Sequence, residues 1–323
     1  MKKKKIMTSL LITAGALLLL AGCGNNKKKD KDVTKIGILQ LIEHQALDET
    51  RAGFIAELEK QGYKEGEDVD IDFQNAQGDQ ANLKSMSDRL ASDQNDLNLA
   101  IATQAAQSLI SADNETPTLF TAITDPIDAG LVKDVDKPGG NITGTSDMVP
   151  VKEQIKLLQS IVPNAKKVGL LYNSSEPNSK LQIELAKKEL DKLNIEYLEM
   201  TVTSTNDVEQ VTRSIAKKVD AIYIPSDNTF TSAMSTVGDI SKETQIPVIP
   251  ATGPMVELGG IATYGIDYFK LGEQTAQMAV KILKGEATPE TMPVETLESL
   301  SLIINEEMAK KLGIDPTSIK APQ

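Results

Sequence analysis

Lys35-Ile36-Gly37-Ile38-Leu39 recurs as Lys167-Val168-Gly169-Leu170-Leu171, and this repeated apolar segment decides the fold. Each copy is short and continuously apolar, which is typical of a strand buried on both faces. After each copy the same patterns follow in the same order. They are a helical period (50–61 and 179–193), a strand (69–73 and 195–202), a helix (79–91 and 205–217), an apolar strand (97–102 and 221–224), and a further helix and strand (104–123 and 229–250). Strands that alternate with helices predict an α/β protein with two doubly wound parallel-sheet lobes.

The order of these patterns also predicts the domain boundaries. Residues 33–146 are expected to form lobe one, and residues 147–263 are expected to form lobe two. A broad apolar face between Asp267 and Leu283, followed by Gly285, predicts a helix that returns 264–299 to lobe one. The sequence does not decide which lobe holds 300–323. Three connections between the lobes predict a hinge that closes on a ligand.

The N-terminus carries a secretion signal. Four lysines at 2–5 precede an apolar run from Ile6 to Leu20, which is too short to span a bilayer. The run ends in Leu20-Ala21-Gly22-Cys23, which resembles the bacterial lipobox, and this predicts removal of 1–22 and lipidation of Cys23. Residues 23–32 then form a flexible tether, because the polar, lysine-rich residues after Cys23 bury no core. An uncleaved anchor with an incidental cysteine is the alternative.

Composition excludes several classes of partner. The net charge is -12, and it becomes -16 once the four lysines of the signal segment are removed. Such acidity argues against nucleic acid, which is bound through Lys and Arg. Cys23 is the single cysteine, so its lipidation leaves none for a disulfide or a cysteine metal site. We expect no metal and no cofactor.

Polar residues follow the predicted strands of both lobes. In open α/β sheets ligands bind beyond the carboxyl ends of the strands, and two facing lobes turn these edges into a cleft. Side chains with hydroxyl, carboxylate or amide groups occupy this place at Thr124, Asp125 and Ser146 in lobe one, and at Asn173, Ser226, Asp227 and Asn228 in lobe two. The same residue types commonly cap helices, so capping is the alternative role for each of them.

The sequence lacks the common motifs of enzyme active sites. It contains no G-x-S-x-G, G-x-x-x-x-G-K-[ST], G-x-G-x-x-G or H-E-x-x-H motif. The only histidine, His44, lies in the first strand-end loop, where ligand contact or packing is favoured over catalysis because no nucleophile motif accompanies it. We therefore expect a binding protein and not an enzyme.

Several of these loops resemble those of one family. They are Thr124-Asp125-Pro126, Pro138 to Gly144, Tyr223 to Asn228, and Thr263 to Tyr268. Together with the lipobox they resemble the substrate-binding lipoproteins of ABC importers, in the tryptophan/tyrosine-type group. The resemblance implies a periplasmic-binding-protein type I fold and an aromatic L-amino acid ligand. It also implies delivery to a permease and ATPase encoded elsewhere, from a lipid-anchored position outside the cell membrane. A receptor for a membrane sensor and a surface adhesion lipoprotein are the alternatives.

An amino-acid ligand needs donors for its carboxylate and acceptors for its ammonium group. The predicted donors are the start of the helix after the third strand and two hydroxyls, at Thr103, Gln104, Ala105 and Thr124. The predicted acceptors are Asp227 and Asp267, with Asp125 as an alternative. The ligand side chain is expected to contact Leu47, Tyr264 and Pro254, with Met255 as either a contact or plain packing.

Overall fold

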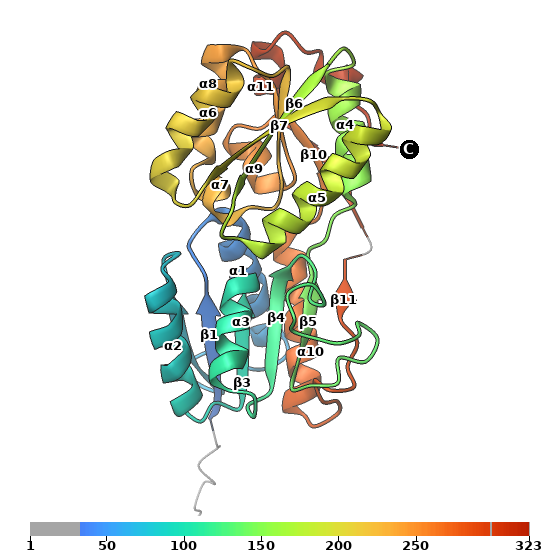
Figure 1. Ribbon diagram of the computed structural model, residues 1–323. Helices are drawn as coiled ribbons and strands as arrows, with labels where there is room; N and C mark the ends of the chain where they lie inside the picture. Colours follow the sequence, from blue (N-terminus) through green and yellow to red (C-terminus); the bar gives the residue numbers. More distant parts are fainter. Residues whose placement is uncertain (1–32, 298, 323) are drawn as a thin grey trace, which may run out of the picture. The chain divides into compact units, whose positions relative to one another are not determined.

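The computed structural model describes residues 33–297 and 299–322 of the 323-residue chain. The signal segment 1–22, Cys23 and the tether predicted for 23–32 lie outside the described residues. From Val33 onward the chain forms one compact unit, in which two lobes are each built on a parallel sheet (Figure 1). The predicted fold class is confirmed. Among the described helices, none is both long enough and apolar enough to cross a membrane.

Lobe one is a six-stranded parallel sheet with the strand order β11-β5-β4-β3-β1-β2. Helices from the N-terminal part of the chain cover it, and one helix comes from far along the sequence. The elements are β1 (Thr34–Gln40), α1 (Gln45–Lys60), β2 (Val69–Asn75), α2 (Gln80–Ser92), β3 (Leu97–Ile101), α3 (Thr103–Ala112), β4 (Thr118–Ile123), β5 (Ile142–Ser146), α10 (Tyr268–Leu283) and β11 (Glu295–Thr296).

Lobe two repeats this winding in a four-stranded parallel sheet, β7-β6-β8-β9, beside an antiparallel pair, β10-β12. Its elements are α4 (Val151–Ile161), β6 (Lys167–Asn173), α5 (Pro177–Lys192), β7 (Glu196–Val202), the 3-10 turn η1 (Thr205–Asp207), α6 (Val208–Ala216), β8 (Ala221–Ile224), α7 (Asn228–Ser232), α8 (Met234–Thr244), β9 (Val248–Pro250), α9 (Gly253–Leu258), β10 (Ala262–Gly265), β12 (Ser301–Ile304), α11 (Glu306–Lys311) and the 3-10 turn η2 (Pro316–Ser318).

The repeated segment forms β1 and β6, which hold equivalent places in the two sheets. Successive residues of β6 face opposite ways, so Leu170 packs into one apolar cluster of lobe two and Leu171 into the other. The shared glycine lets a helix approach the sheet, because a Cβ at Gly169 would lie 2.9 Å from Cδ1 of Ile215 on α6. Both faces of this sheet are therefore covered by helices.

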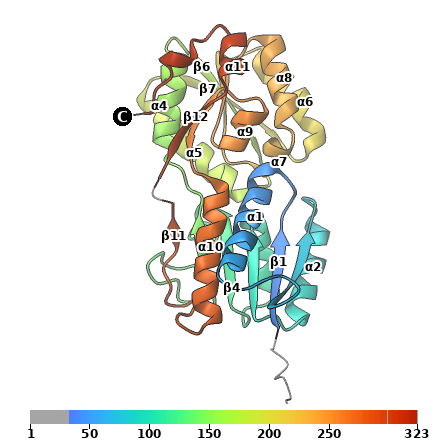
Figure 2. The same cartoon turned by 180° about the vertical axis from the view of Figure 1, so that it is seen from behind.

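The C-terminal part of the chain contributes helices and strands to both lobes. Helix α10 packs beside α1 on lobe one (Figure 2). Their backbones touch, since a Cβ at Gly272 would overlap the carbonyl oxygen of Thr50, and one at Gly53 would overlap that of Phe269. After β11 the chain returns to lobe two, where Ala309 lies in the core. The sequence left 300–323 undecided, and the structure places its strand β12 and helix α11 in lobe two.

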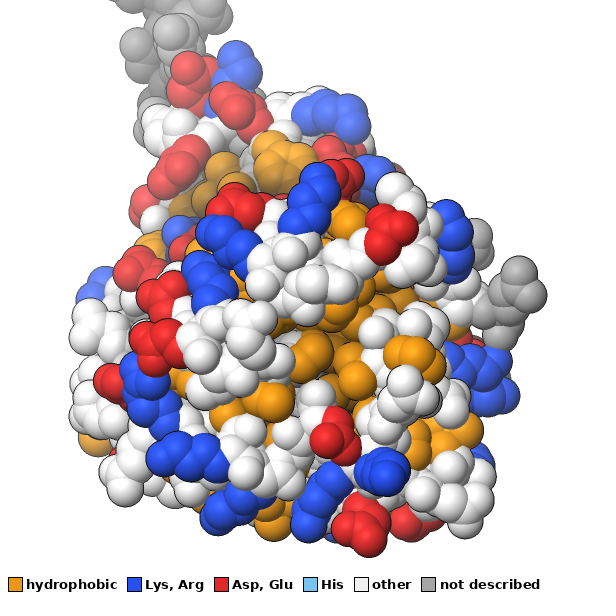
Figure 3. Space-filling model, turned by 90° about the horizontal axis from the view of Figure 1, so that it is seen from above, with side chains coloured by type: hydrophobic (Ala, Val, Ile, Leu, Met, Phe, Trp, Pro, Cys, Tyr) orange, Lys and Arg blue, Asp and Glu red, His pale blue; other side chains and the backbone are white. Residues whose placement is uncertain are grey.

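Seen from above, lobe two shows interspersed charges of both signs around hydrophobic and uncharged side chains (Figure 3). Ion pairs along single helices account for part of this pattern. On α8, Nζ of Lys242 lies 3.1 Å from Asp239, and on α11, Nζ of Lys310 lies 2.9 Å from Glu306. Pairs spaced three or four residues apart stabilise exposed helices by only a few tenths of a kcal/mol each, about 0.2–0.5.

Candidate functional site

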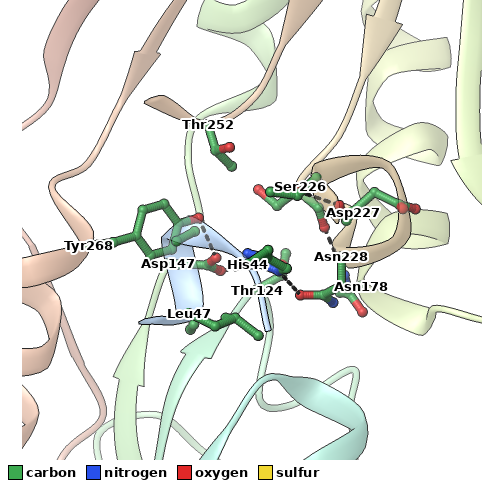
Figure 4. A pocket seen from close by; sticks show the side chains of 13 residues that line it. His44, Leu47, Thr124, Asp147, Asn178, Ser226, Asp227, Asn228, Thr252 and Tyr268 are labelled. Carbon is green, nitrogen blue, oxygen red and sulfur yellow. Dashed lines mark hydrogen bonds between the residues drawn. The ribbon is translucent and has the colours of Figure 1, made fainter. Parts of the chain in front are cut away.

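A small cavity lies at the carboxyl ends of the strands, with walls from both lobes (Figure 4). Among the described residues that line it there is no Lys or Arg, so a ligand carboxylate would have to be held by neutral donors. The lining residues are His44, Ala46, Leu47, Ala122, Thr124, Asp147 and Tyr268, which belong to lobe one, and Asn178, Ser226, Asp227, Asn228, Thr231 and Thr252, which belong to lobe two.

The start of α1 and a bulged strand form part of the lobe-one wall. His44 precedes the helix, and Ala46 and Leu47 belong to its first turn, where backbone N–H groups have no acceptor within the helix. Strand β4 shifts its register against β5 between Phe120 and Ile123, and Ala122 takes a φ of 55°. Bulges and residues at positive φ are common beside binding sites, because they redirect neighbouring side chains.

A buried carboxylate completes this wall. One oxygen of Asp147 accepts a hydrogen bond from the hydroxyl of Tyr268 at 2.9 Å, and the other accepts one from Thr124 at 3.4 Å. Burial raises the pKa of Asp147, although these two hydrogen bonds act in the opposite direction. Burial and the charge of Asp147 also raise the pKa of Tyr268. Because none of the described lining residues is Lys or Arg, this carboxylate is available to a cationic group of a ligand.

The lobe-two wall contains a second buried carboxylate, which is held by its own lobe. Oδ1 of Asp227 caps α7 by accepting from the backbone N–H of Phe230 at 2.8 Å. Oδ2 accepts from the backbone N–H of Asn173 at 2.6 Å and from the hydroxyl of Ser179 at 2.8 Å. Burial, followed by the charge of Glu176, raises the pKa of Asp227. Both oxygens of Asp227 therefore have donors from lobe two.

Four buried polar atoms of the cavity lining have no hydrogen-bond partner among the described residues. They are Nδ1 of His44, Oδ1 of Asn178, Oγ of Ser226 and Oγ1 of Thr252. Buried polar atoms in folded proteins are almost always paired, so each unpaired atom needs an explanation. Their convergence on one cavity, from both lobes, indicates a binding site for a small polar molecule.

Hydrogen bonds join the two lobes around the cavity. Nε2 of Gln182 donates to Oγ1 of Thr124 at 3.0 Å, and Nε2 of His44 lies 3.0 Å from Oδ1 of Asn228. Near the surface, Gln104 donates to the carbonyl oxygen of Ser175 at 3.0 Å. The cavity is thus enclosed by lobes that contact each other through polar groups.

Five of the residues predicted from the sequence line this cavity. They are Leu47, Thr124, Ser226, Asp227 and Asn228. For Asp227 the structure shows the capping role, which the sequence left as an alternative to ligand contact.

The other predicted residues lie elsewhere or have local partners. Asp125 accepts from the backbone N–H groups of residues 127 and 128, and Asp267 caps α10. Gln104 and Asn173 line a separate groove, and Pro254 lines a third hollow together with Asp267. The side chain of Ser146 donates to the carbonyl oxygen of Thr124. Three more predicted residues do not line the cavity. Thr103 and Ala105 are buried in lobe one, and Tyr264 packs against the core of lobe two.

Seven lining residues are not among those predicted from the sequence, and for His44 the sequence predicts only contact or packing. The seven are Ala46, Ala122, Asp147, Asn178, Thr231, Thr252 and Tyr268. Asp147 and Thr252 lie in loops at strand ends, where the sequence predicts a site: Asp147 directly follows the predicted residue Ser146, and Thr252 shares a loop with the predicted residue Pro254. Tyr268 lies in the segment that carried the family resemblance. Asn178 sits in the first turn of α5 and has no sequence signal of its own.

The chain matches known proteins over nearly its whole length. The family model described as "ABC transporter substrate binding protein" matches residues 35–318. The chain is 39% identical over 327 residues to a tyrosine-binding protein of Clostridioides difficile, covering 98% of this chain and 94% of that protein.

Two solved structures are similar at comparable identity. One is the ABC domain from Streptococcus pneumonia in complex with L-Trp, which is 41% identical with a TM-score of 0.85 and covers 90% of this chain and 98% of that one. The other is the ligand-free, open structure of a substrate-binding protein with adhesive properties from Clostridium difficile. It is 46% identical with a TM-score of 0.68, covering 88% of this chain and 96% of that one. The chain superposes better on the L-Trp complex than on the open, ligand-free structure, although its sequence identity to the complex is lower. This chain therefore belongs to the ABC transporter substrate-binding proteins and has the periplasmic-binding-protein type I fold.

Proposed function

We propose that this protein captures an L-amino acid, with tyrosine or tryptophan preferred, in the cavity between its lobes. The observation that carries this proposal is the convergence of four unpaired polar atoms on one cavity. They include an acceptor that requires a donor, Oδ1 of Asn178, and hydroxyls that can donate, on Ser226 and Thr252. A zwitterion presents both kinds of partner within a few bonds, whereas a simple anion presents one.

Electrostatics assigns an end of the cavity to each charged group of the ligand. Asp147 is a buried carboxylate without a cationic partner among the described lining residues, and it suits an ammonium group. The hydroxyl of Ser226 and the N–H groups at the start of α1 suit a carboxylate. Each unpaired charge would otherwise be costly in a buried site, so pairing both groups selects for amino acids.

The preference for an aromatic side chain rests on the relatives and on the apolar part of the lining. The related proteins are named for tyrosine or are solved with L-Trp. Ala46, Leu47 and Ala122 are the aliphatic residues of the lining, which also contains the ring of Tyr268.

Calorimetric titration of the mature protein with all twenty L-amino acids tests the proposal. We expect heat with tyrosine or tryptophan, and about fivefold weaker binding in Ser226→Ala, since a hydrogen bond contributes about 1 kcal/mol. Ser232→Ala is the matched control, because its hydroxyl donates to the carbonyl oxygen of Asn228 on the exposed side of α7. Binding of a sugar in place of every amino acid would refute the ligand class.

We further propose that the protein acts as a lipid-anchored, extracytoplasmic component of an ABC importer and performs no chemistry on its ligand. Support comes from the family and from the predicted signal segment 1–22, which directly precedes Cys23. Uptake of labelled tyrosine or tryptophan by cells that lack this protein is the direct test. Undiminished uptake at a limiting concentration would contradict the importer role and favour a receptor that presents its ligand to a sensor.

Adhesion is a second candidate function, because a relative at 46% identity is described as having adhesive properties. Attachment of intact cells to host-cell layers, compared between the wild type and a deletion strain, tests it. Equal attachment of the two strains would remove this candidate without touching the importer proposal.

A further inference from the structure

His44, the single histidine of the chain, is the last member of a chain of hydrogen bonds that runs from Glu176 through Asn228. Glu176 determines which atoms in this chain donate and which accept. Oε2 of Glu176 accepts from the backbone N–H of Asn228 at 3.0 Å and from its Nδ2 at 2.6 Å. Oε1 accepts from the backbone N–H and the hydroxyl of Thr229, each at 3.1 Å. A carboxylate can only accept, so the amide nitrogen of Asn228 must point at Glu176 and its oxygen must point away.

The amide oxygen of Asn228 faces the imidazole of His44 across the lobe interface. Oδ1 of Asn228 lies 3.0 Å from Nε2 of His44. Since this oxygen is an acceptor, Nε2 must carry the hydrogen, and in a neutral imidazole Nδ1 then carries a lone pair. The tautomer of a lobe-one side chain is thus set by a carboxylate of lobe two.

The lone pair of His44 has no partner in the part of the chain that the structure describes. Nδ1 is buried and unpaired, and the ring lies in the cavity lining between Asp147 and Asn228 (Figure 4). An unpaired acceptor here repels a carboxylate, which also offers only lone pairs, and it favours an N–H donor.

The charged groups around His44 do not reverse this assignment. Burial lowers the pKa of His44, and it outweighs the hydrogen bond to Asn228 and the charge of Asp48 on α1, which both raise this pKa. Asp147 on the cavity wall and Asp227 with Glu176 in lobe two are the acidic groups nearby, and each is already paired with donors of its own. His44 is therefore neutral at pH 7.

We propose that His44 determines ligand specificity by accepting, through Nδ1, a hydrogen bond from the ammonium group of the bound amino acid. This inference rests on the proposed function. It also links recognition to closure, because Asn228 and Glu176 fix the His44 tautomer only while the two lobes are in contact.

The first test uses the fact that the sequence contains a single histidine. Untagged protein labelled with ¹⁵N-histidine gives one imidazole spectrum. With saturating L-tyrosine or L-tryptophan we expect the Nε2–H tautomer, and a shift of the Nδ1 resonance in the direction of hydrogen-bond acceptance. An Nδ1–H tautomer, a protonated ring, or an Nδ1 resonance unchanged by the ligand would overturn the proposal.

The second test removes the acceptor and keeps the lobe contact. In His44→Gln the side-chain amide replaces Nε2–H as donor to Asn228, but it has no atom at the place of Nδ1. We expect L-tyrosine to lose at least tenfold in affinity, and 3-(4-hydroxyphenyl)propanoate, which lacks the ammonium group, to lose less than threefold. Equal losses for the two probes would overturn the role of His44 while leaving amino-acid binding intact. If the wild type binds none of the twenty amino acids, the proposed function falls, and this inference falls with it.

Discussion

The substitution Asp227→Asn tests how the hydrogen bonds of this buried carboxylate and the cost of burying its charge together affect the stability of the protein. In the structure Asp227 accepts three hydrogen bonds, from the backbone N–H groups of Phe230 and Asn173 and from the hydroxyl of Ser179. Asparagine keeps one oxygen, which can continue to cap α7. Its NH₂ group then faces the N–H of Asn173, which loses its acceptor.

The expected cost follows from that one lost partner. Leaving a buried backbone N–H unpaired costs about 1–3 kcal/mol, whereas the hydroxyl of Ser179 can rotate and accept from the new amide. Removing a buried negative charge beside Glu176 acts in the opposite direction, because burial and that charge disfavour ionised Asp227. We expect Asp227→Asn to destabilise the protein by about 1–3 kcal/mol at pH 5 and by less at pH 8.

The pH dependence has a definite sign. The pKa of Asp227 is raised in the folded protein, so between the unfolded value near 3.9 and the folded value the native state binds more protons than the unfolded state. Wild-type stability then falls as pH rises through this window, by up to about 1.4 kcal/mol for each pH unit. The asparagine variant lacks this contribution, so the difference between the two proteins shrinks with rising pH.

Urea unfolding of both proteins at several pH values from 5 to 8 measures this difference. Asp79→Asn is the matched control, because Asp79 caps α2 by accepting from the backbone N–H of Asn82 on the exposed surface. Asparagine caps as well as aspartate there, and we expect a change near zero at every pH. A difference for Asp227→Asn that grows from pH 5 to pH 8 would refute the reasoning.

Three further changes have expected outcomes. Gly272→Ala should cost about 2–4 kcal/mol in thermal or urea unfolding, because its Cβ overlaps a carbonyl oxygen of α1 and the helices must separate; Gly140→Ala, with open space around it, should cost little. Tyr268→Phe removes a donor from buried Asp147 and should cost about 1.5–3 kcal/mol at pH 7, with a smaller loss near pH 4, where protonation of Asp147 makes the donor less important. Cys23→Ala should leave the melting temperature unchanged but release the protein from washed membranes, and retention there would indicate an uncleaved anchor.

The sheets were predictable because their signal is local. Buried parallel strands are continuously apolar, and the helices between them show a period near 3.6, so order and type can be inferred without tertiary contacts. Strand β12 (Ser301–Ile304) shows the limit. Its apolar residues suit a strand in either lobe, and only its pairing with β10 places it in lobe two.

The site was only partly predictable, because it depends on which of two neighbouring residues faces the cavity. Ser146 and Asp147 are adjacent at the end of β5, where successive side chains point in opposite directions. Ser146 turns back to the carbonyl oxygen of Thr124, and Asp147 lines the cavity. The place of Tyr268 in the site could not be predicted from the sequence, because it depends on the close packing of α10 on α1. This packing brings together residues more than 200 positions apart in the sequence.

The interlobe contacts explain why ligand binding and lobe closure should be a single event. Each interlobe hydrogen bond, such as that from Gln182 to Thr124, contributes about 0.5–1.5 kcal/mol net. Enclosing the cavity buries four polar atoms without partners, and each costs about 1–3 kcal/mol. The cost therefore matches or exceeds the gain from the few bonds that join the lobes. A ligand that pairs these atoms removes the cost only in the closed form, and this difference in affinity between the two forms shifts the lobes toward closure.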